Sequence, residues 1–273
     1  SRPMKEGVIA DYDVTRAMLA YFINRVGAPV LFFKPEVMIC VPAGCTQVER
    51  RAVLDAALSA GARVAYLIDE PLASALGAKL PIAAPSGHMI VDSGGGATEA
   101  AVISLGGVVV HRSIRVAGNK IDEAIQAYLR RRHNLIIGDQ QAEEIKLGIG
   151  YAIPPQREER QEVSGRDQIL GLPRTVIVTS GEVNEAIRPV LNQMIGTIKE
   201  VLEEILPELA SDIIDKGVVM SGGTSLLRGL PALMTQELGV PVHLAQDPLL
   251  CVIRGTGLAL ENFDLYKSSI MRK

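Results

Sequence analysis

Uninterrupted apolar runs alternate along the first part of the chain with segments whose apolar residues recur at helical spacing. Residues 37–41 and 64–68 are such runs, typical of strands buried on both faces of a sheet. A helix is predicted after the first run, because Thr46 and Glu49 have the spacing of a capping box. Residues 11–26 predict a further amphipathic helix. This alternation of strands and helices favours an α/β protein.

The pattern changes at residue 88 to three short strands in a meander, expected at 88–92, 99–105 and 108–116. Asn119 is the expected N-cap of the helix that follows. Residues 150–172 are polar and lack periodicity, which predicts a flexible loop within a small insertion.

The last third of the chain returns to the alternating pattern. Ser180 is the expected cap of a long amphipathic helix that runs toward Leu206, and Pro189 predicts a kink or a break within it. A buried strand is expected at 218–220 and a final helix from Asp247 through Leu260.

Composition limits the classes of function. A length of 273 residues allows one large domain or two ordinary ones. The net charge of -3 gives no electrostatic case for nucleic acid as a partner, and the basic triplet 130–132 is more simply a solvated helix end. Three cysteines, without metal-ligand spacing or an even count, favour a reducing cytoplasm.

The stretch from Asp92 to Glu99 predicts a strand, a glycine-rich turn and a returning strand. Gly94, Gly95 and Gly96 would let backbone N–H groups approach an oxyanion, which is phosphate-binding geometry. Asp92 would repel a bare phosphate but suits one that carries Mg²⁺. The alternative is an ordinary hairpin turn rich in glycine.

Two further polar segments follow predicted strands. Glu70 lies just past the run at 64–68, where open α/β sheets place their ligands, and is a candidate base or water-orienting group. Alternatively, it only stabilises the N-terminus of the next helix. Residues 221–225 form a second glycine turn, which offers backbone N–H groups to a polar ligand or serves only for tight packing.

Leu31, Phe32 and Phe33 lie in an apolar stretch between Pro29 and Pro35 that has no periodic partner. It is either a loop tucked under the core or an exposed patch for a membrane or a partner.

Taken together, Pro42–Arg51, Asp69–Pro71, Val91–Gly96 and Ser221–Ser225 closely resemble the MreB family of bacterial actins, and the resemblance covers essentially the whole chain. It implies an actin-like ATPase (ribonuclease-H-like) α/β fold. Such a fold has two domains of mixed five-stranded sheets flanked by helices, with ATP and Mg²⁺ in the cleft between them.

The resemblance also implies a division of the chain and a role for each site residue. Residues 1–87 would belong to the first domain, with helix 248–264 packing back on it; 88–120 and 173–247 would form the second, and 121–172 an inserted subdomain. Glu70 would orient the attacking water and Asp92 would help to hold hydrated Mg²⁺. The remaining implied contacts are Gly94, Gly95, Gly96 and Thr98 with phosphate, and Glu143, Lys146, Gly222, Gly223 and Thr224 with adenosine.

Two departures from the family pattern bear on activity. The family usually has a threonine where this chain has Ala97, and the resemblance implies that its hydroxyl helps to position the water. Ala97 is therefore expected to slow hydrolysis without preventing binding, which gives a slow ATPase in the complete protein. The first domain should also begin with a meander bearing its own phosphate loop, which we expect upstream of Ser1.

The function implied is an ATP-binding (ATP/ADP) cytoskeletal protein that forms filaments on the inner face of the cytoplasmic membrane, docked through Leu31, Phe32 and Phe33. It would organise cell-wall synthesis and maintain rod shape. Its partners would be further copies of itself, the membrane, cell-wall elongation proteins and membrane-anchored shape proteins, without nucleic acid. The alternatives are a nucleotide-binding scaffold that hydrolyses little and a sugar kinase, which would need a substrate-side base and a sugar pocket.

Overall fold

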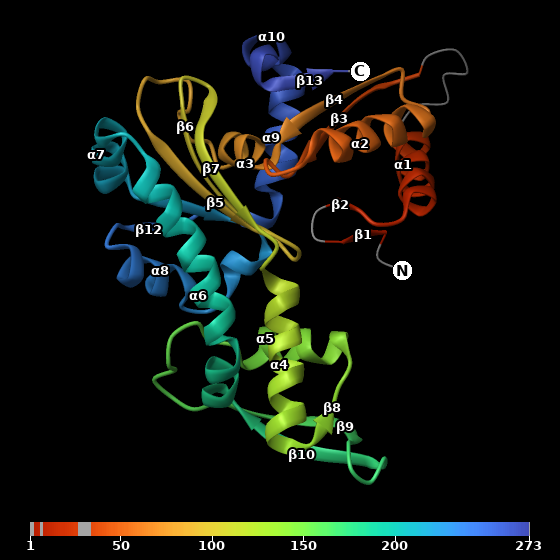
Figure 1. The fold of residues 1–273 in the computed structure, drawn as a ribbon, viewed down its shortest axis with the longest axis vertical. Helices are drawn as coiled ribbons and strands as arrows, with labels where there is room; N and C mark the ends of the chain where they lie inside the picture. The colour runs from red at the N-terminus through yellow and green to blue at the C-terminus, as the bar shows by residue number, and fades with distance from the viewer. Residues whose placement is uncertain (1–2, 6–7, 27–33, 273) are drawn as a thin grey trace.

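The computed structural model describes residues 3–5, 8–26 and 34–272 (Figure 1). Its largest sheet has five strands in the order β12-β11-β5-β6-β7. These strands are β5 (His88–Ser93), β6 (Thr98–Ser104), β7 (Gly107–Ile114), β11 (Val218–Ser221) and β12 (Val242–Leu244). The predicted meander is confirmed as β5, β6 and β7, which pair antiparallel, whereas β11 is parallel to both β5 and β12. The sheet is therefore mixed.

Both faces of this sheet are covered by helices. They are α4 (Gly118–His133) and α6 (Ser180–Glu204) on one side, and α3 (Glu70–Gly77) and α9 (Cys251–Glu261) on the other. Along β5 the side chains alternate between the two: Met89 and Val91 join the core under α4 and α6, and Ile90 joins the core around α3 and α9. A strand buried on both faces has to be apolar at consecutive positions, which explains the continuous run 89–91.

A second sheet has the order β13-β4-β3. Its strands are β3 (Glu36–Val41), β4 (Val64–Asp69) and β13 (Ile270–Arg272). Helix α2 (Gln47–Ser59), which begins at the predicted Thr46–Glu49 capping box, packs Leu54 and Ala57 on one face of this sheet. The described residues contribute three strands here, whereas the resemblance implied five. Strand β13 was not anticipated from the pattern.

Helices α3 and α9 lie between the two sheets. Ile68 of β4 and Ile90 of β5 belong to the same apolar cluster as Leu72 of α3 and Ala259 of α9. Both helices thus contribute to one core that is shared by the two halves of the molecule, and Figure 1 shows the pair in this intermediate position.

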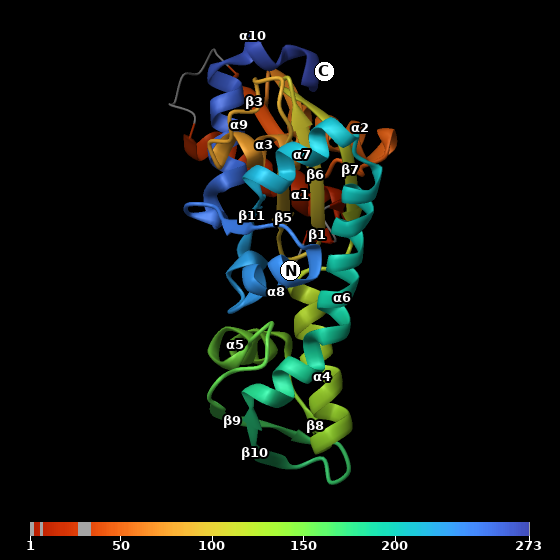
Figure 2. The ribbon, with the colours of Figure 1, turned by 90° about the vertical axis from the view of Figure 1, so that its left-hand side faces the viewer.

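The segment between α4 and α6 forms a separate lobe at the lower end of the molecule, and α6 runs from it up along the large sheet (Figure 2). It consists of α5 (Asp139–Ile149) and a sheet of β8 (Leu135–Ile136), β9 (Arg160–Asp167) and β10 (Pro173–Thr179). The prediction of an aperiodic loop over 150–172 was wrong for β9. Only Val163 and Asp167 of this strand are buried, so it is held by backbone pairing with β10 and lacks an apolar alternation.

Helix boundaries differ from expectation in three places. Thr179 caps α6 in a capping box with Glu182, so Ser180 is already helical. Pro189 does not break α6, because Ile187 and Leu191 on either side are fully buried and their packing offsets the lost backbone hydrogen bond. The N-cap of α4 is Ala117, with Asn119 inside the helix.

The predicted N-terminal helix is confirmed as α1 (Tyr12–Val26), yet Phe22 and Val26 on it are 53% and 85% exposed. No helix among the described residues is long and apolar enough to cross a membrane. The remaining elements are β1 (Met4–Lys5), β2 (Val8–Ile9), α7 (Pro207–Lys216), α8 (Leu230–Leu238), α10 (Phe263–Tyr266) and 3-10 turns at Gly223–Leu226, Pro248–Leu250 and Lys267–Ser269.

The contact between α3 and α9 depends on two glycines. A Cβ on Gly255 would lie 1.6 Å from the carbonyl oxygen of Ala73, and a Cβ on Gly77 would lie 1.8 Å from that of Cys251. Any side chain at either position would push the two helix backbones apart. Glycine is therefore required here for close approach, at some cost in helix propensity.

We expect Gly255→Ala to destabilise the protein by roughly 1–3 kcal/mol, because it overpacks this contact. Gly257→Ala is the matched control: Gly257 is on the same helix, is exposed, and has no atom within 4 Å of its added Cβ. It should be neutral or stabilise by up to about 1 kcal/mol through helix propensity. Urea unfolding of both variants measures the difference, and equal effects would contradict the contact described.

Candidate functional site

The parallel pairing of β5 with β11 places the two predicted glycine turns side by side. In this register Asp92 at the end of β5 lies opposite Ser221 at the end of β11. The chain turns after Ser221 and, one residue beyond Asp92, after Ser93. The carboxyl ends of adjacent parallel strands are the usual ligand-binding edge of an α/β sheet.

The second turn needs glycine at its first position. Gly222 has φ of +82°, and a Cβ on it would lie 2.3 Å from the carbonyl oxygen of Ser93. The following residues then approach the first turn, where the Thr224 hydroxyl donates to the carbonyl oxygen of Gly94 at 2.7 Å. A direct hydrogen bond thus joins the two turns.

A cavity of about 320 Å³ opens beside these turns. Its wall includes six residues predicted from the sequence, namely Gly94, Gly95, Glu143, Lys146, Gly223 and Thr224. The residues that were not predicted are Gly118, Asn119, Ile121, Leu147, Gly150, Leu226, Leu227, Arg228 and Leu249. The wall therefore combines backbone-rich turns with apolar side chains and a few charges, as ligand pockets commonly do.

The first turn of α4 forms part of this wall. The backbone N–H of Gly118 donates to Gly94 O at 3.2 Å, and that of Asn119 donates to Gly95 O at 2.8 Å. The start of a 16-residue helix is thereby held against the glycine turn. A helix N-terminus carries partial positive charge and favours anions, so this end of the cavity suits a phosphate.

Lys146 supplies a fixed positive charge to the wall. Its ammonium nitrogen lies 2.9 Å from a carboxylate oxygen of Asp122 and 3.4 Å from the carbonyl oxygen of Gly118. The two charged side chains are only 13% and 11% exposed. Burial with a partner keeps Lys146 ordered at the junction of α4 and α5.

Arg228 connects the second glycine turn to the lower lobe. Its guanidinium donates to the carbonyl oxygen of Gly148 at 2.7 Å and to the carboxylate of Glu159 at 2.9 Å. It also lies over the ring of Tyr151, 4.9 Å from the centroid. Arg228 thus holds the C-terminal end of α5 against the second glycine turn. Glu143 and Lys146 lie earlier on the same helix. No local pattern marks this role, because the partners of Arg228 are about 70 to 80 residues away in the sequence.

Three carboxylates lie outside the cavity wall, around the end of β5. Burial raises the pKa of Glu70 to about 8, with the negative charges of Glu99 and Asp92 adding to the effect. Burial likewise raises the pKa of Glu99 to about 7, against the opposing effect of a hydrogen bond from Ser113 and with a contribution from the negative charge of Asp92. Burial also raises the pKa of Asp92, while hydrogen bonds from Ser221 and Ser74 act in the opposite direction.

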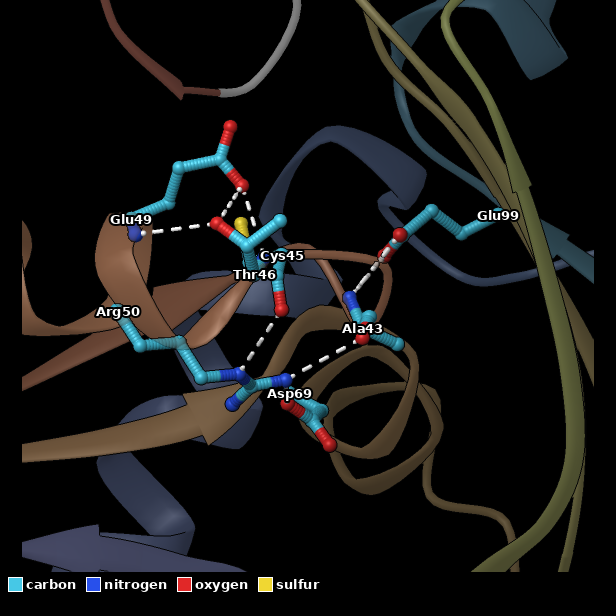
Figure 3. Close-up of polar contacts among 7 residues, drawn as sticks. All are labelled: Ala43, Cys45, Thr46, Glu49, Arg50, Asp69 and Glu99. Atoms are coloured by element: carbon cyan, nitrogen blue, oxygen red, sulfur yellow. Dashed lines mark hydrogen bonds and ion pairs between the residues drawn. The ribbon is translucent and has the colours of Figure 1, made fainter.

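Glu99, which no sequence pattern marks as a site residue, joins the two halves of the molecule (Figure 3). Its carboxylate accepts the backbone N–H of Ala43 at 3.0 Å, in the loop between β3 and α2. Arg50 of α2 binds the same loop through the carbonyl oxygens of Ala43 and Cys45, and pairs with Asp69 at 2.6 Å. The loop thereby connects the strand after the first glycine turn to the residue preceding Glu70.

Other predicted residues are placed differently. Gly96, Thr98 and Gly222 are not part of the cavity wall, and the Thr98 hydroxyl donates to Val116 O, just after β7, at 2.7 Å. Their contacts with a ligand stay predictions. Leu31, Phe32 and Phe33 lie outside the described residues.

The site is compatible with a cation that is coordinated mainly by the phosphate oxygens of a bound molecule and only partly by the protein. Burial disfavours the charged forms of the three carboxyl groups around the end of β5, as does neighbouring negative charge for Glu70 and Glu99, and a cation bound nearby would favour their ionised forms. Among the described residues no three His, Cys, Asp or Glu side chains could enclose a metal ion. Mg²⁺ commonly uses one or two carboxylates together with phosphate oxygens and water, so a site with a single carboxylate ligand is compatible with this ion.

Known proteins are similar to this chain in sequence and in fold. The MreB/Mbl protein family matches residues 1–268. This chain belongs to the MreB/Mbl family. The cell shape-determining protein Mbl of Bacillus subtilis is 47% identical over 263 residues, covering 96% of this chain and 79% of the relative. The cell shape-determining protein MreB of Escherichia coli K12 is 48% identical over 266 residues, covering 97% and 77%.

Solved structures agree with the MreB/Mbl assignment and confirm the actin-like fold. The crystal structure of MreB5 of Spiroplasma citri bound to ADP superposes with a TM-score of 0.91 at 34% identity, covering 97% of this chain and 80% of that one. The MamK double helical filament superposes with a TM-score of 0.82 at 24% identity, covering 96% and 80%, and shows the fold alone.

The raised pKa of Glu70 predicts a pH-dependent effect of Glu70→Gln on stability. The unfolded chain releases this proton near pH 4.3, whereas the folded protein retains it up to about pH 8. Wild-type stability therefore loses up to roughly 1.4 kcal/mol for each pH unit within this window, and the glutamine variant lacks that loss.

Urea unfolding between pH 5 and pH 9 should show that the advantage of Glu70→Gln grows with pH and levels off above about pH 8. The control is Glu144→Gln at an exposed position, whose difference from wild type should not vary with pH in this way. A constant difference for Glu70→Gln would contradict the raised pKa.

Proposed function

We propose that this chain binds ATP and ADP with Mg²⁺ and assembles into membrane-bound filaments that determine cell shape. The observation that carries nucleotide binding is the cavity where two glycine turns, the start of α4 and the Lys146 ammonium group converge. One relative, MreB5 of Spiroplasma citri at 34% identity, was solved with ADP and with AMPPNP bound, which supports the same ligand class here.

The proposed roles follow the chemistry of each part of the cavity. Gly94, Gly95 and the first turn of α4 would receive phosphate, with Gly96 and Thr98 completing the turn. Glu143, Lys146, Gly222, Gly223 and Thr224 would contact adenosine. Asp92 would orient a hydrated Mg²⁺, which when bound would neutralise phosphate charge.

Hydrolysis is the second part of the proposal. Glu70 would orient the attacking water, for which it has to be ionised, and its pKa of about 8 opposes this in the nucleotide-free protein. Ala97 offers no hydroxyl to help. These two observations favour a second candidate function, a nucleotide-binding filament scaffold with little turnover.

Cell shape and self-assembly are proposed from the family. Curated relatives at 47–48% identity are named cell shape-determining proteins. We propose that the chain polymerises, lies peripherally on the inner face of the cytoplasmic membrane and contacts cell-wall elongation proteins and membrane-anchored shape proteins. The apolar stretch of Leu31, Phe32 and Phe33 would insert into the membrane, and a filament would multiply a weak single site.

Nucleotide binding is tested by Glu143→Ala with Glu144→Ala as its matched control. Both residues are exposed neighbours on α5, and only Glu143 is part of the cavity wall. We expect Glu143→Ala to weaken ADP binding about tenfold, the usual size of a lost hydrogen bond to a charged group. Isothermal titration with Mg²⁺-ADP measures this. Equal affinities of the two variants would refute the adenosine-side role, and no binding by wild type would refute the function.

Ala97→Thr separates the ATPase from the scaffold. Restoring the hydroxyl should raise phosphate release severalfold while polymer, measured by pelleting from the same sample, stays unchanged. Wild-type polymer without phosphate release, together with release by the variant, would assign the scaffold function. Turnover that requires an added sugar would point to a kinase.

The membrane contact is tested by Phe32→Ser in co-sedimentation with vesicles of phosphatidylglycerol. Loss of one buried aromatic side chain should weaken binding about tenfold or more. Leu170→Ser is the control, because it also replaces an apolar side chain by serine. Leu170 lies in the lower lobe and is 72% exposed. Unchanged binding of Phe32→Ser, or an equal loss in the control, would count against the stretch as the membrane site.

A further inference from the structure

A chain of two buried hydroxyls ends on the carboxylate of Asp92. The Ser221 hydroxyl donates to Asp92 Oδ1 at 2.7 Å, and the Ser74 hydroxyl oxygen lies 2.5 Å from that of Ser221. Both serines are fully buried and Asp92 is 7% exposed. The three residues come from α3, β11 and β5, so the chain crosses from the helix between the sheets to the large sheet.

The hydrogen bonds in this chain have a defined direction. Each hydroxyl has one proton, and Ser221 gives its proton to Asp92. Ser221 can then only accept in its contact with Ser74, so Ser74 is the donor there. The hydrogen bonds therefore run in sequence, from Ser74 to Ser221 and from Ser221 to the Asp92 carboxylate.

The position of Ser74 on α3 connects it to Glu70. Ser74 follows Glu70 by four residues, which places the two side chains on the same face of α3, one turn apart. The hydroxyl chain therefore leaves α3 beside the proposed water-orienting residue and ends on the proposed metal ligand. A shift of α3 relative to β5 would therefore change the positions of Glu70 and of the hydrogen bonds to Asp92 together.

We propose that Ser74 is a positioning residue that, through Ser221, fixes the orientation of the Asp92 carboxylate toward a Mg²⁺-bound nucleotide. This inference rests on the proposed function, in which Asp92 orients hydrated Mg²⁺. Hydrogen bonds to a ligating carboxylate set its direction, and their loss typically costs 10-fold to 100-fold in metal affinity. Ser74 is not part of the cavity wall, so it acts on the nucleotide only through Asp92.

The test compares ADP affinity with Mg²⁺ and with EDTA, which measures the metal contribution without turnover. We expect Ser74→Ala to reduce the enhancement of ADP binding by Mg²⁺ about tenfold while the affinity in EDTA stays at the wild-type value. The reduction should disappear in an Asp92→Asn background, because the carboxylate that Ser74 orients is then absent.

Ser180→Ala is the control for loss of a buried hydroxyl elsewhere, since Ser180 is fully buried and hydrogen-bonds to Glu159 outside the cavity. It should leave the Mg²⁺ enhancement unchanged. Ser74→Cys, which keeps a weak donor of similar size, should give an intermediate value. Intermediate enhancement would separate positioning from a merely structural role.

The remaining outcomes each overturn the proposal. An unchanged Mg²⁺ enhancement in Ser74→Ala would refute the role of Ser74, and failure of both Ser74 variants to fold would reduce it to a structural role. Wild-type ADP binding that is equal in Mg²⁺ and EDTA would refute this inference while leaving nucleotide binding intact. Absence of wild-type ADP binding in both would refute the proposed function itself.

Discussion

The parallel pairing of β5 with β11 decides where both glycine turns lie, and the rest of the candidate site is built against those turns. The pairing sets Asp92 beside Ser221, and from there each chain turns toward the same cavity. It also requires Gly222, because any side chain would enter the backbone of Ser93. Helix α4 and the Arg228 contacts then close the cavity from the lobe below.

The helices between the two sheets add a second constraint. Helix α3 carries Glu70 at its start and Ser74 one turn later, and α9 holds it through contacts that only glycine permits. Because the two helices share one apolar core with strands of both sheets, the carboxylates around β5 are positioned by both halves of the molecule. The loop between β3 and α2 joins the same two halves at a second point, because Ala43 in this loop hydrogen-bonds to both Glu99 and Arg50.

Much of the fold could be predicted because its signals are local. The apolar runs of β3 and β4, the Thr46–Glu49 capping box and the glycine turns each lie within a few residues of sequence. Strands β9 and β13 escaped prediction because they depend on pairing with another strand more than on an apolar pattern. The same holds within the site: Glu99, Arg228 and the hydroxyls of Ser74 and Ser221 acquire their roles from partners far away in the chain, whereas Gly94, Glu143 and Lys146 could be selected by resemblance.

The distribution of the cavity wall along the chain has a consequence for biosynthesis. Its residues run from Gly94 to Leu249, and the strand that flanks β4 on its second side begins only at Ile270. Contacts between residues so far apart form late, since the intervening chain has to be ordered first. A nascent chain on the ribosome would therefore lack this cavity until nearly all of these residues had emerged. A ligand of this cavity could then stabilise only molecules in which the residues up to Leu249 have already been synthesised.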